Sequence, residues 1–394
     1  MKKLVVIAAL LALLLQGALF ALPRYALMTG AKCGSCHVNP TGGEMRTEYG
    51  STFSLNALPL KAHKEDDFSF NPKLTDNISI GGDARGQFLY DFAKDPSDSV
   101  KGKNSFQAMT ASFYGSILLS KKISFYFKQD FVNIDYGWSY SGPEVFGIAK
   151  LFPHNGYIKA GIFMPDYGWR LDDHTTYTRG GDISIGNGWF AANGLFFNPN
   201  YKDIGVESGF NIDDFTITAS ILNGTGNQSH YYLSTDKAYT GKIEYLGKVS
   251  DLNYRLGVSG YGFKSYKMGA ITAGFAYDDW ILYGEVDFTH HKLLDPTNAI
   301  HPIDEHANMS AAFAELDFQA IQGLWLTGKY DMSDPFNGIA DNDLTPTTNA
   351  VQRLIFGLEF FPYSFVELRP QYRHFIEKPS ADNDQALIQL HMWF

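Results

Sequence analysis

The two cysteines of the chain lie three residues apart, and a histidine follows the second one directly. They form the pattern CxxCH in the stretch Cys33-Gly34-Ser35-Cys36-His37. Two thiols at this spacing can form thioether bonds to the two vinyl groups of one porphyrin, and the adjacent imidazole can then reach the iron. The pattern predicts one covalent c-type haem, with His37 as the proximal iron ligand.

The same cysteines have two alternative interpretations. Exported proteins form disulfides, so Cys33 and Cys36 could be bonded to each other. They could also be a redox-active dithiol, although thioredoxin-like pairs lie near a βαβ pattern and this sequence has none. Haem attachment is favoured because the motif uses both cysteines of the chain and includes His37.

Two methionines are candidates for the distal iron ligand. Met28 lies five residues before Cys33, and Met45 lies eight residues after His37. A methionine ligand raises the reduction potential of the iron, and the glycines before Met45 allow the chain to fold back. Packing in the haem pocket is the alternative role for each methionine, and a histidine or an open position is the alternative ligand state.

The first 21 residues have the composition of a secretory signal peptide. Lys2 and Lys3 precede an apolar stretch over residues 4–15, and small residues precede the expected cleavage near Ala21. A retained membrane anchor is the alternative. The formal net charge of −10 argues against a nucleic-acid partner.

The haem motif lies in a short segment, which we delimit as residues 22–60, followed by a connector over residues 61–76. A segment below about 40 residues rarely forms a stable core by itself. The haem segment must therefore pack against the rest of the chain.

Residues 77–394 alternate apolar and polar side chains with the period of a β-strand. Leu282, Val286 and Phe288 fall on one face of their stretch, and Glu285 and Asp287 fall on the other. No apolar run after residue 22 reaches the roughly 20 residues of a spanning helix. Carboxylates and guanidinium groups on one face predict a transmembrane barrel with a polar lumen, and a soluble sandwich is the alternative.

Short and long connections alternate along this region, as they do in bacterial outer-membrane barrels. Counting them, together with two further short connections near Phe263 and Pro379, predicts an all-β, sixteen-stranded antiparallel barrel with both chain ends on the periplasmic side. The longest connection is expected to fold partly into the lumen, the alternative being a surface loop. Tight turns are predicted at 120–121, 153–155, 213–214, 250–251, 278–279, 322–323 and 362–363, and longer connections at 93–103, 133–142, 164–202, 223–237, 292–307 and 334–349.

Residues 386–394 form an alternating stretch that ends in an aromatic residue, Phe394. It resembles the closing strand of bacterial outer-membrane proteins, whose terminal Phe is read by the assembly machinery. This resemblance implies the outer membrane as the location and its lipid as a partner.

The haem motif followed by a barrel resembles the fused monohaem cytochrome c–porin family of the outer membrane, of the iron-oxidiser type. The resemblance at the front is carried by residues 23–30 leading into CxxCH, and the stretch 161–165 before the longest loop is similar to phosphate-selective porins. From the family, Cys33, Cys36 and His37 carry over as haem-attachment residues. The run over residues 38–43 departs from the iron-oxidising members.

The resemblance implies electron transfer between an extracellular donor, with ferrous iron as a candidate, and a periplasmic c-type cytochrome or other soluble carrier. The enzymatic form of this hypothesis is an iron-oxidising cytochrome. The alternative function is a selective outer-membrane porin for anions or small solutes, with a haem or disulfide plug and no respiratory role.

Overall fold

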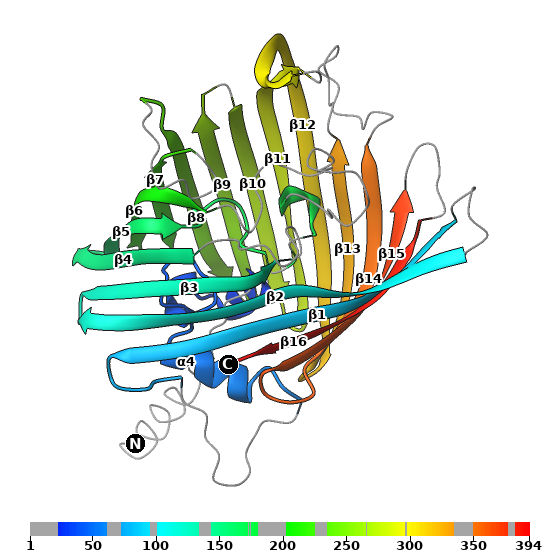
Figure 1. The fold of residues 1–394 in the computed structure, drawn as a ribbon. Helices are drawn as coiled ribbons and strands as arrows, with labels where there is room; N and C mark the ends of the chain where they lie inside the picture. The colour runs from blue at the N-terminus through cyan, green and yellow to red at the C-terminus, as the bar shows by residue number, and fades with distance from the viewer. Residues whose placement is uncertain are drawn as a thin grey trace.

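Sixteen antiparallel strands form one closed barrel in the computed structural model of the chain, each paired with its sequence neighbours and β1 paired with β16 (Figure 1). The structure describes residues 23–60, 72–94, 101–133, 143–171, 173, 175–179, 202–224, 235–264, 266–295, 298–334, 350–376 and 383–394. The predicted signal peptide lies outside these residues. The predicted fold class and strand number are confirmed, because one sheet closes on itself and leaves no second sheet for a sandwich.

The strand bounds follow the predicted turns closely. The strands are β1 (Ile78–Lys94), β2 (Lys101–Ser120), β3 (Ile123–Asn133), β4 (Pro143–Phe152), β5 (Gly156–Phe163), β6 (Asp203–Ile212), β7 (Phe215–Leu222), β8 (Ala238–Val249), β9 (Leu252–Phe263), β10 (Tyr266–Tyr277), β11 (Trp280–Asp295), β12 (Asn298–Ile321), β13 (Leu324–Asp334), β14 (Val351–Phe360), β15 (Val366–Ile376) and β16 (Gln385–Trp393).

Apolar side chains face outward and charged side chains face the lumen. On β11 the side chains of Leu282 and Val286 are 48% and 40% exposed, whereas Glu285 and Asp287 are 1% and 0% exposed. A surface of this kind is stable only against lipid, because an apolar face of this extent is not left in water. The predicted assignment of the two faces is confirmed.

One predicted loop is wrong. Residues 292–307 are polar and were expected to form a long connection, but β11 continues to Asp295 and β12 begins at Asn298. The pairing runs through Lys292 opposite His306, with register shifts beyond it. Beyond the membrane an antiparallel pair keeps its hydrogen bonds in water, so polar residues do not end it.

The last strand closes the barrel as predicted. β16 pairs with β1 from Asp83 opposite Trp393 to Asp91 opposite Gln385. At the chain end, the Phe394 amide donates to the Gly82 carbonyl over 3.0 Å. No helix among the described residues is long and apolar enough to cross a membrane.

The N-terminal segment lies inside the barrel at the end where the short turns are found, shown in blue in Figure 1. It contains α2 (Pro23–Thr29), α3 (Cys33–Cys36) and α4 (Glu48–Asn56). Hydrogen bonds tie it to three of those turns: Lys32 Nζ to the Asp213 carbonyl (2.7 Å), Gln322 Nε2 to the Pro59 carbonyl (2.9 Å) and Ser364 Oγ to the Leu55 carbonyl (2.8 Å). Short turns face the periplasm in such barrels.

The described part of the longest connection, which starts at residue 164, folds into the lumen as predicted. Tyr167 donates to Asp287 over 2.8 Å, and Trp169 Nε1 donates to the Gly284 carbonyl over 2.8 Å. Arg179 pairs with Glu285 at 2.8 Å. We call residues 164–171, 173 and 175–179 the inward loop. The extra hairpin expected near residues 183–197 lies outside the described residues.

Candidate functional site

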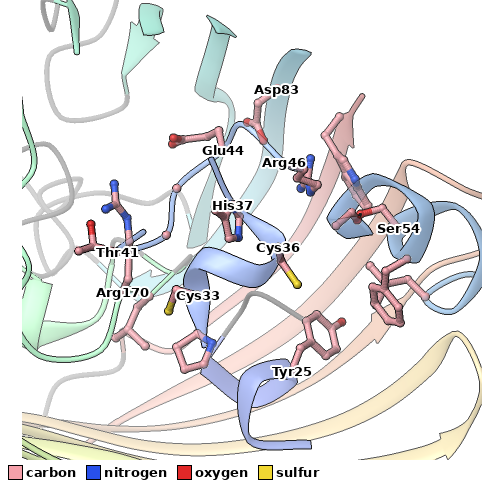
Figure 2. A pocket seen from close by; sticks show the side chains of 18 of the residues that line it. Tyr25, Cys33, Cys36, His37, Thr41, Glu44, Arg46, Ser54, Asp83 and Arg170 are labelled. Atoms are coloured by element: carbon pink, nitrogen blue, oxygen red, sulfur yellow. Dashed lines mark hydrogen bonds between the residues drawn. The ribbon is translucent and has the colours of Figure 1, made fainter. Parts of the chain in front are cut away.

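The CxxCH motif forms one short helical turn. The His37 amide donates to the Cys33 carbonyl over 3.0 Å, which closes the turn and brings both cysteines and the histidine to one side. Cys36 is buried and Cys33 is partly exposed. The sulfurs and the imidazole all line one cavity (Figure 2).

The chain folds back directly after the motif. Val38 and Met45 are joined by a backbone hydrogen bond of 3.0 Å, and His37 forms an antiparallel bridge with Arg46. Gly42 and Gly43 have φ values of +93° and +126°, a region that glycine enters at little cost. The resulting hairpin brings Arg46 next to the proximal-ligand candidate.

The helix α4 packs across the back of the motif. The Thr47 hydroxyl caps it by accepting from the Gly50 amide at 3.2 Å, and the Thr47 amide donates to the Cys36 carbonyl at 2.8 Å. A Cβ at Gly50 would collide with the Cys36 carbonyl oxygen. Only glycine therefore lets α4 lie this close to the cysteines.

The cavity holds about 1170 Å³ of empty volume, part of it open to solvent. Its walls come from the N-terminal segment, the inward loop and the barrel. They include the apolar and aromatic residues Pro23, Tyr25, Phe53, Leu58, Trp169, Leu171, Phe361 and Trp393, and the basic residues Arg46, Arg170, Lys242 and Arg255.

This lining fits a covalent haem c. Two cysteine side chains and an imidazole meet in one space, aromatic walls can pack on a porphyrin, and cations are available for its two carboxylates. Burial, with a smaller contribution from Cys33, raises the pKa of the Cys36 thiol to about 12.

Neither methionine predicted as distal ligand lines the cavity. Met45 lies between Glu44 and Arg46, which both do, and neighbouring side chains of an extended chain point to opposite sides. It packs instead in an apolar cluster with Tyr126 and Phe146. Met28 is partly buried against a second cluster beside α2.

A histidine of the last strand also reaches the cavity. His391 lines it from β16, with Nδ1 at 3.0 Å from Glu367 and 3.1 Å from Arg85, and Nε2 at 2.7 Å from Asp83. Both ring nitrogens are therefore engaged. These bonds connect β16 to β1 and β15 at the mouth of the cavity.

Buried ion pairs hold the plug and the cavity walls. Arg24 of α2 pairs with Glu359 and lies 3.7 Å from Asp317. Arg255 pairs with Glu244, and its Nη2 is 3.6 Å from the Cys33 sulfur. Strand alternation predicted a polar lumen, but it gave no sign of which polar residues would meet the motif.

The barrel is similar to several solved outer-membrane proteins. It matches the channel DcaP of Acinetobacter baumannii at 11% identity and a TM-score of 0.53, over 80% of this chain and 97% of that one. It matches OmpF of Salmonella typhi at 12% and 0.53, over 81% and 98%, and a loop-deletion form of OmpT of Vibrio cholerae at 11% and 0.51, over 80% and 99%. No family model and no curated protein sequence matches the chain.

At this identity the likeness establishes the fold and nothing finer. The fold is that of bacterial outer-membrane porins, and the apolar exterior suits the barrel to the outer membrane and its lipid.

Proposed function

We propose that this outer-membrane barrel of porin fold carries one haem c in its lumen and transfers electrons between an extracellular donor and a periplasmic carrier. The observation that carries the proposal is the meeting of Cys33, Cys36 and His37 in one enclosed, aromatic-lined cavity. A periplasmic c-type cytochrome is the carrier, and ferrous iron is the donor we would test first.

The residues have separate tasks in this proposal. Bound haem supplies a one-electron ferrous–ferric couple. Cys33 and Cys36 would hold the cofactor by adding their thiols across its two vinyl groups. His37 would be the protein's ligand to the iron, and Tyr25, Phe53 and Trp169 would pack on the porphyrin.

The position of the segment supports periplasmic exchange. It is tied to the short turns, which face the periplasm. Because the hydrocarbon core is about 30 Å thick, a haem at that end is distant from the outer surface. A small donor must therefore enter the lumen to reduce it.

The packed lumen supports a plug rather than an open pore. Lys159 and Glu207 pair at 2.7 Å with 0% of either side chain exposed, and Arg353 and Asp331 pair at 2.6 Å in the same state. Lumen-facing charges this deeply buried narrow the lumen among the described residues.

The shared fold favours a second candidate, a selective porin in which the N-terminal segment is only a plug. In this alternative the cysteines hold a structural haem or a disulfide, and ions or small solutes pass along the paired charges of the lumen. The fold comparison supports this candidate directly, whereas the cavity supports electron transfer.

Expression with the cytochrome c maturation system separates the two candidates. Electron transfer predicts a covalent haem mass on the processed chain, its loss in Cys36→Ala and its retention in Ser35→Ala, which leaves CxxCH intact. It also predicts that ferrous iron reduces the haem in detergent. A haem-free wild type that conducts ions in a planar bilayer would establish the porin instead, and a haem that no donor reduces would reject electron transfer.

A further inference from the structure

Four basic side chains line the cavity, and they fall into two kinds. Lys242 lies 3.2 Å from Asp166, and Arg255 pairs with Glu244, so each has a carboxylate partner. Arg46 and Arg170 also line the cavity, and neither forms an ion pair within 4.0 Å among the residues that the structure describes, although Glu144 and Glu44 act on Arg170 from farther away.

The surroundings of the two arginines leave their charge available. The Arg46 guanidinium lies 5.7 Å from the centre of the Trp393 ring. Arg170 lies against the fold-back hairpin, with Nη2 3.3 Å from the point where a Cβ on Gly43 would stand. Burial alone would lower the pKa of Arg170, but Glu144 and Glu44 raise it above its ordinary value, so the group stays charged.

Because Arg46 and Arg170 form no close ion pair, their guanidinium groups keep N–H donors available for an added carboxylate. Arginine is the side chain best suited to carboxylates, which it can bind with two parallel hydrogen bonds. Two arginines of this kind in one cavity therefore indicate a ligand that brings carboxylates. Haem c carries two, its propionates, on the porphyrin edge away from the vinyl groups.

The close-up view agrees with this division. In Figure 2 the two thiols lie below His37, while Arg46 and Arg170 lie on either side of it.

Building on the haem of the proposed function, we propose that Arg46 and Arg170 bind its two propionate groups. Arg46 comes from the fold-back hairpin and Arg170 from the inward loop. The cofactor then joins these two elements through its carboxylates. The inward loop is bound to the haem as well as to the barrel wall.

The redox potential reports this contact. A cation near the iron disfavours the additional positive charge of the ferric state. Replacing Arg46 or Arg170 by Gln should lower the midpoint potential and make it more dependent on pH, since an unpaired propionate then takes up a proton on reduction. Arg→Lys at either site keeps the charge and should restore most of the potential.

The test uses the full-length protein matured with haem in detergent. Arg46→Gln, Arg170→Gln, both Lys variants and the double Gln variant are titrated from pH 5 to 9, after mass spectrometry confirms haem on each. Lys264→Gln is the matched control, because it removes one positive charge from an exposed turn that does not line the cavity. The shifts of the single Gln variants should exceed that of the control and add in the double variant.

Hydrogen exchange gives a second measurement. In Arg170→Gln the peptide covering residues 164–171 should exchange faster than in the wild type, while the Arg46 variant leaves it protected. In one outcome, haem is attached but the Gln variants show the same midpoint potential and pH dependence as Lys264→Gln. That result would show that the proposed propionate contacts are wrong, and haem attachment itself would remain supported. A wild type without haem overturns the proposed function, and this inference with it.

Discussion

The backbone of Cys36 occupies the space into which a side chain at Gly50 would project. Gly50→Ala should therefore push α4 away from the motif and lower both haem attachment and thermal stability. Overpacking of this kind costs about 1–3 kcal/mol. Haem content per protein and the unfolding midpoint measure the two effects.

Gly147→Ala is the matched control for that substitution, because a Cβ at Gly147 has no atom within 4 Å among the described residues. It should leave both quantities unchanged. Equal values for the Gly50 and Gly147 variants would show that the close approach of α4 is not required.

Arg24 fixes the plug to the barrel through a buried pair with Glu359. Removing one partner of a buried pair leaves an uncompensated charge and costs roughly 3–5 kcal/mol. Arg24→Met should therefore loosen the N-terminal segment, which limited proteolysis detects as new cleavage within residues 22–60. Lys73→Met breaks an exposed pair with Glu48 and should not change the pattern. Wild-type protection in Arg24→Met would count against the anchoring role.

The N-terminal segment should block conduction. A chain in which residues 22–60 are deleted after the signal should form a barrel with higher conductance in planar bilayers, since its buried lumen charges become hydrated. Cys33→Ala/Cys36→Ala keeps the segment and should stay closed. Identical conductance in the two variants would mean that the segment does not obstruct the lumen.

Asp173 ties the inward loop to the barrel. Burial alone would raise its pKa, but Lys329, Arg373 and Arg353 hold it well below its ordinary range. The unfolded pKa is about 3.9, so the stabilisation is complete above that pH and is lost only as the pH falls through the lower folded value.

Hydrogen exchange of the loop should therefore be constant, after correction for intrinsic rates, from neutral pH to about pH 5. Asp173→Asn should expose the loop throughout that range by removing the charge. Protection that fades near pH 6 in the wild type would show that another group controls the loop.

Much of the fold was predictable because barrel residues that face outward contact lipid, whereas those that face inward contact polar groups. Lipid outside and polar groups inside impose a strict period of two, so Leu282 and Glu285 could be assigned to faces without any tertiary information. The same rule failed at residues 292–307, where the strands leave the membrane and polarity no longer marks a loop.

The site was predictable only in its covalent part. Thioether chemistry fixes the spacing of Cys33, Cys36 and His37, so these residues can be recognised from the sequence alone. The direction of the Met45 side chain depends on the hairpin made by Gly42 and Gly43. The position of Arg170 next to that hairpin depends on how the inward loop folds into the lumen. The contact of Arg170 with Gly43 joins segments more than 100 residues apart and leaves no local pattern.

The β11–β12 ribbon has 16 and 24 residues in its two strands, whereas about 9–11 residues suffice to span the bilayer. The additional residues of β11 and β12 extend beyond the rest of the barrel at the end where the long connections lie. An epitope tag inserted between Asp295 and Asn298 would be reachable by antibody on intact cells, while the same tag at the turn between Asp213 and Asp214 would stay hidden. The ribbon thus offers a display point for fixing the orientation of the molecule in living cells.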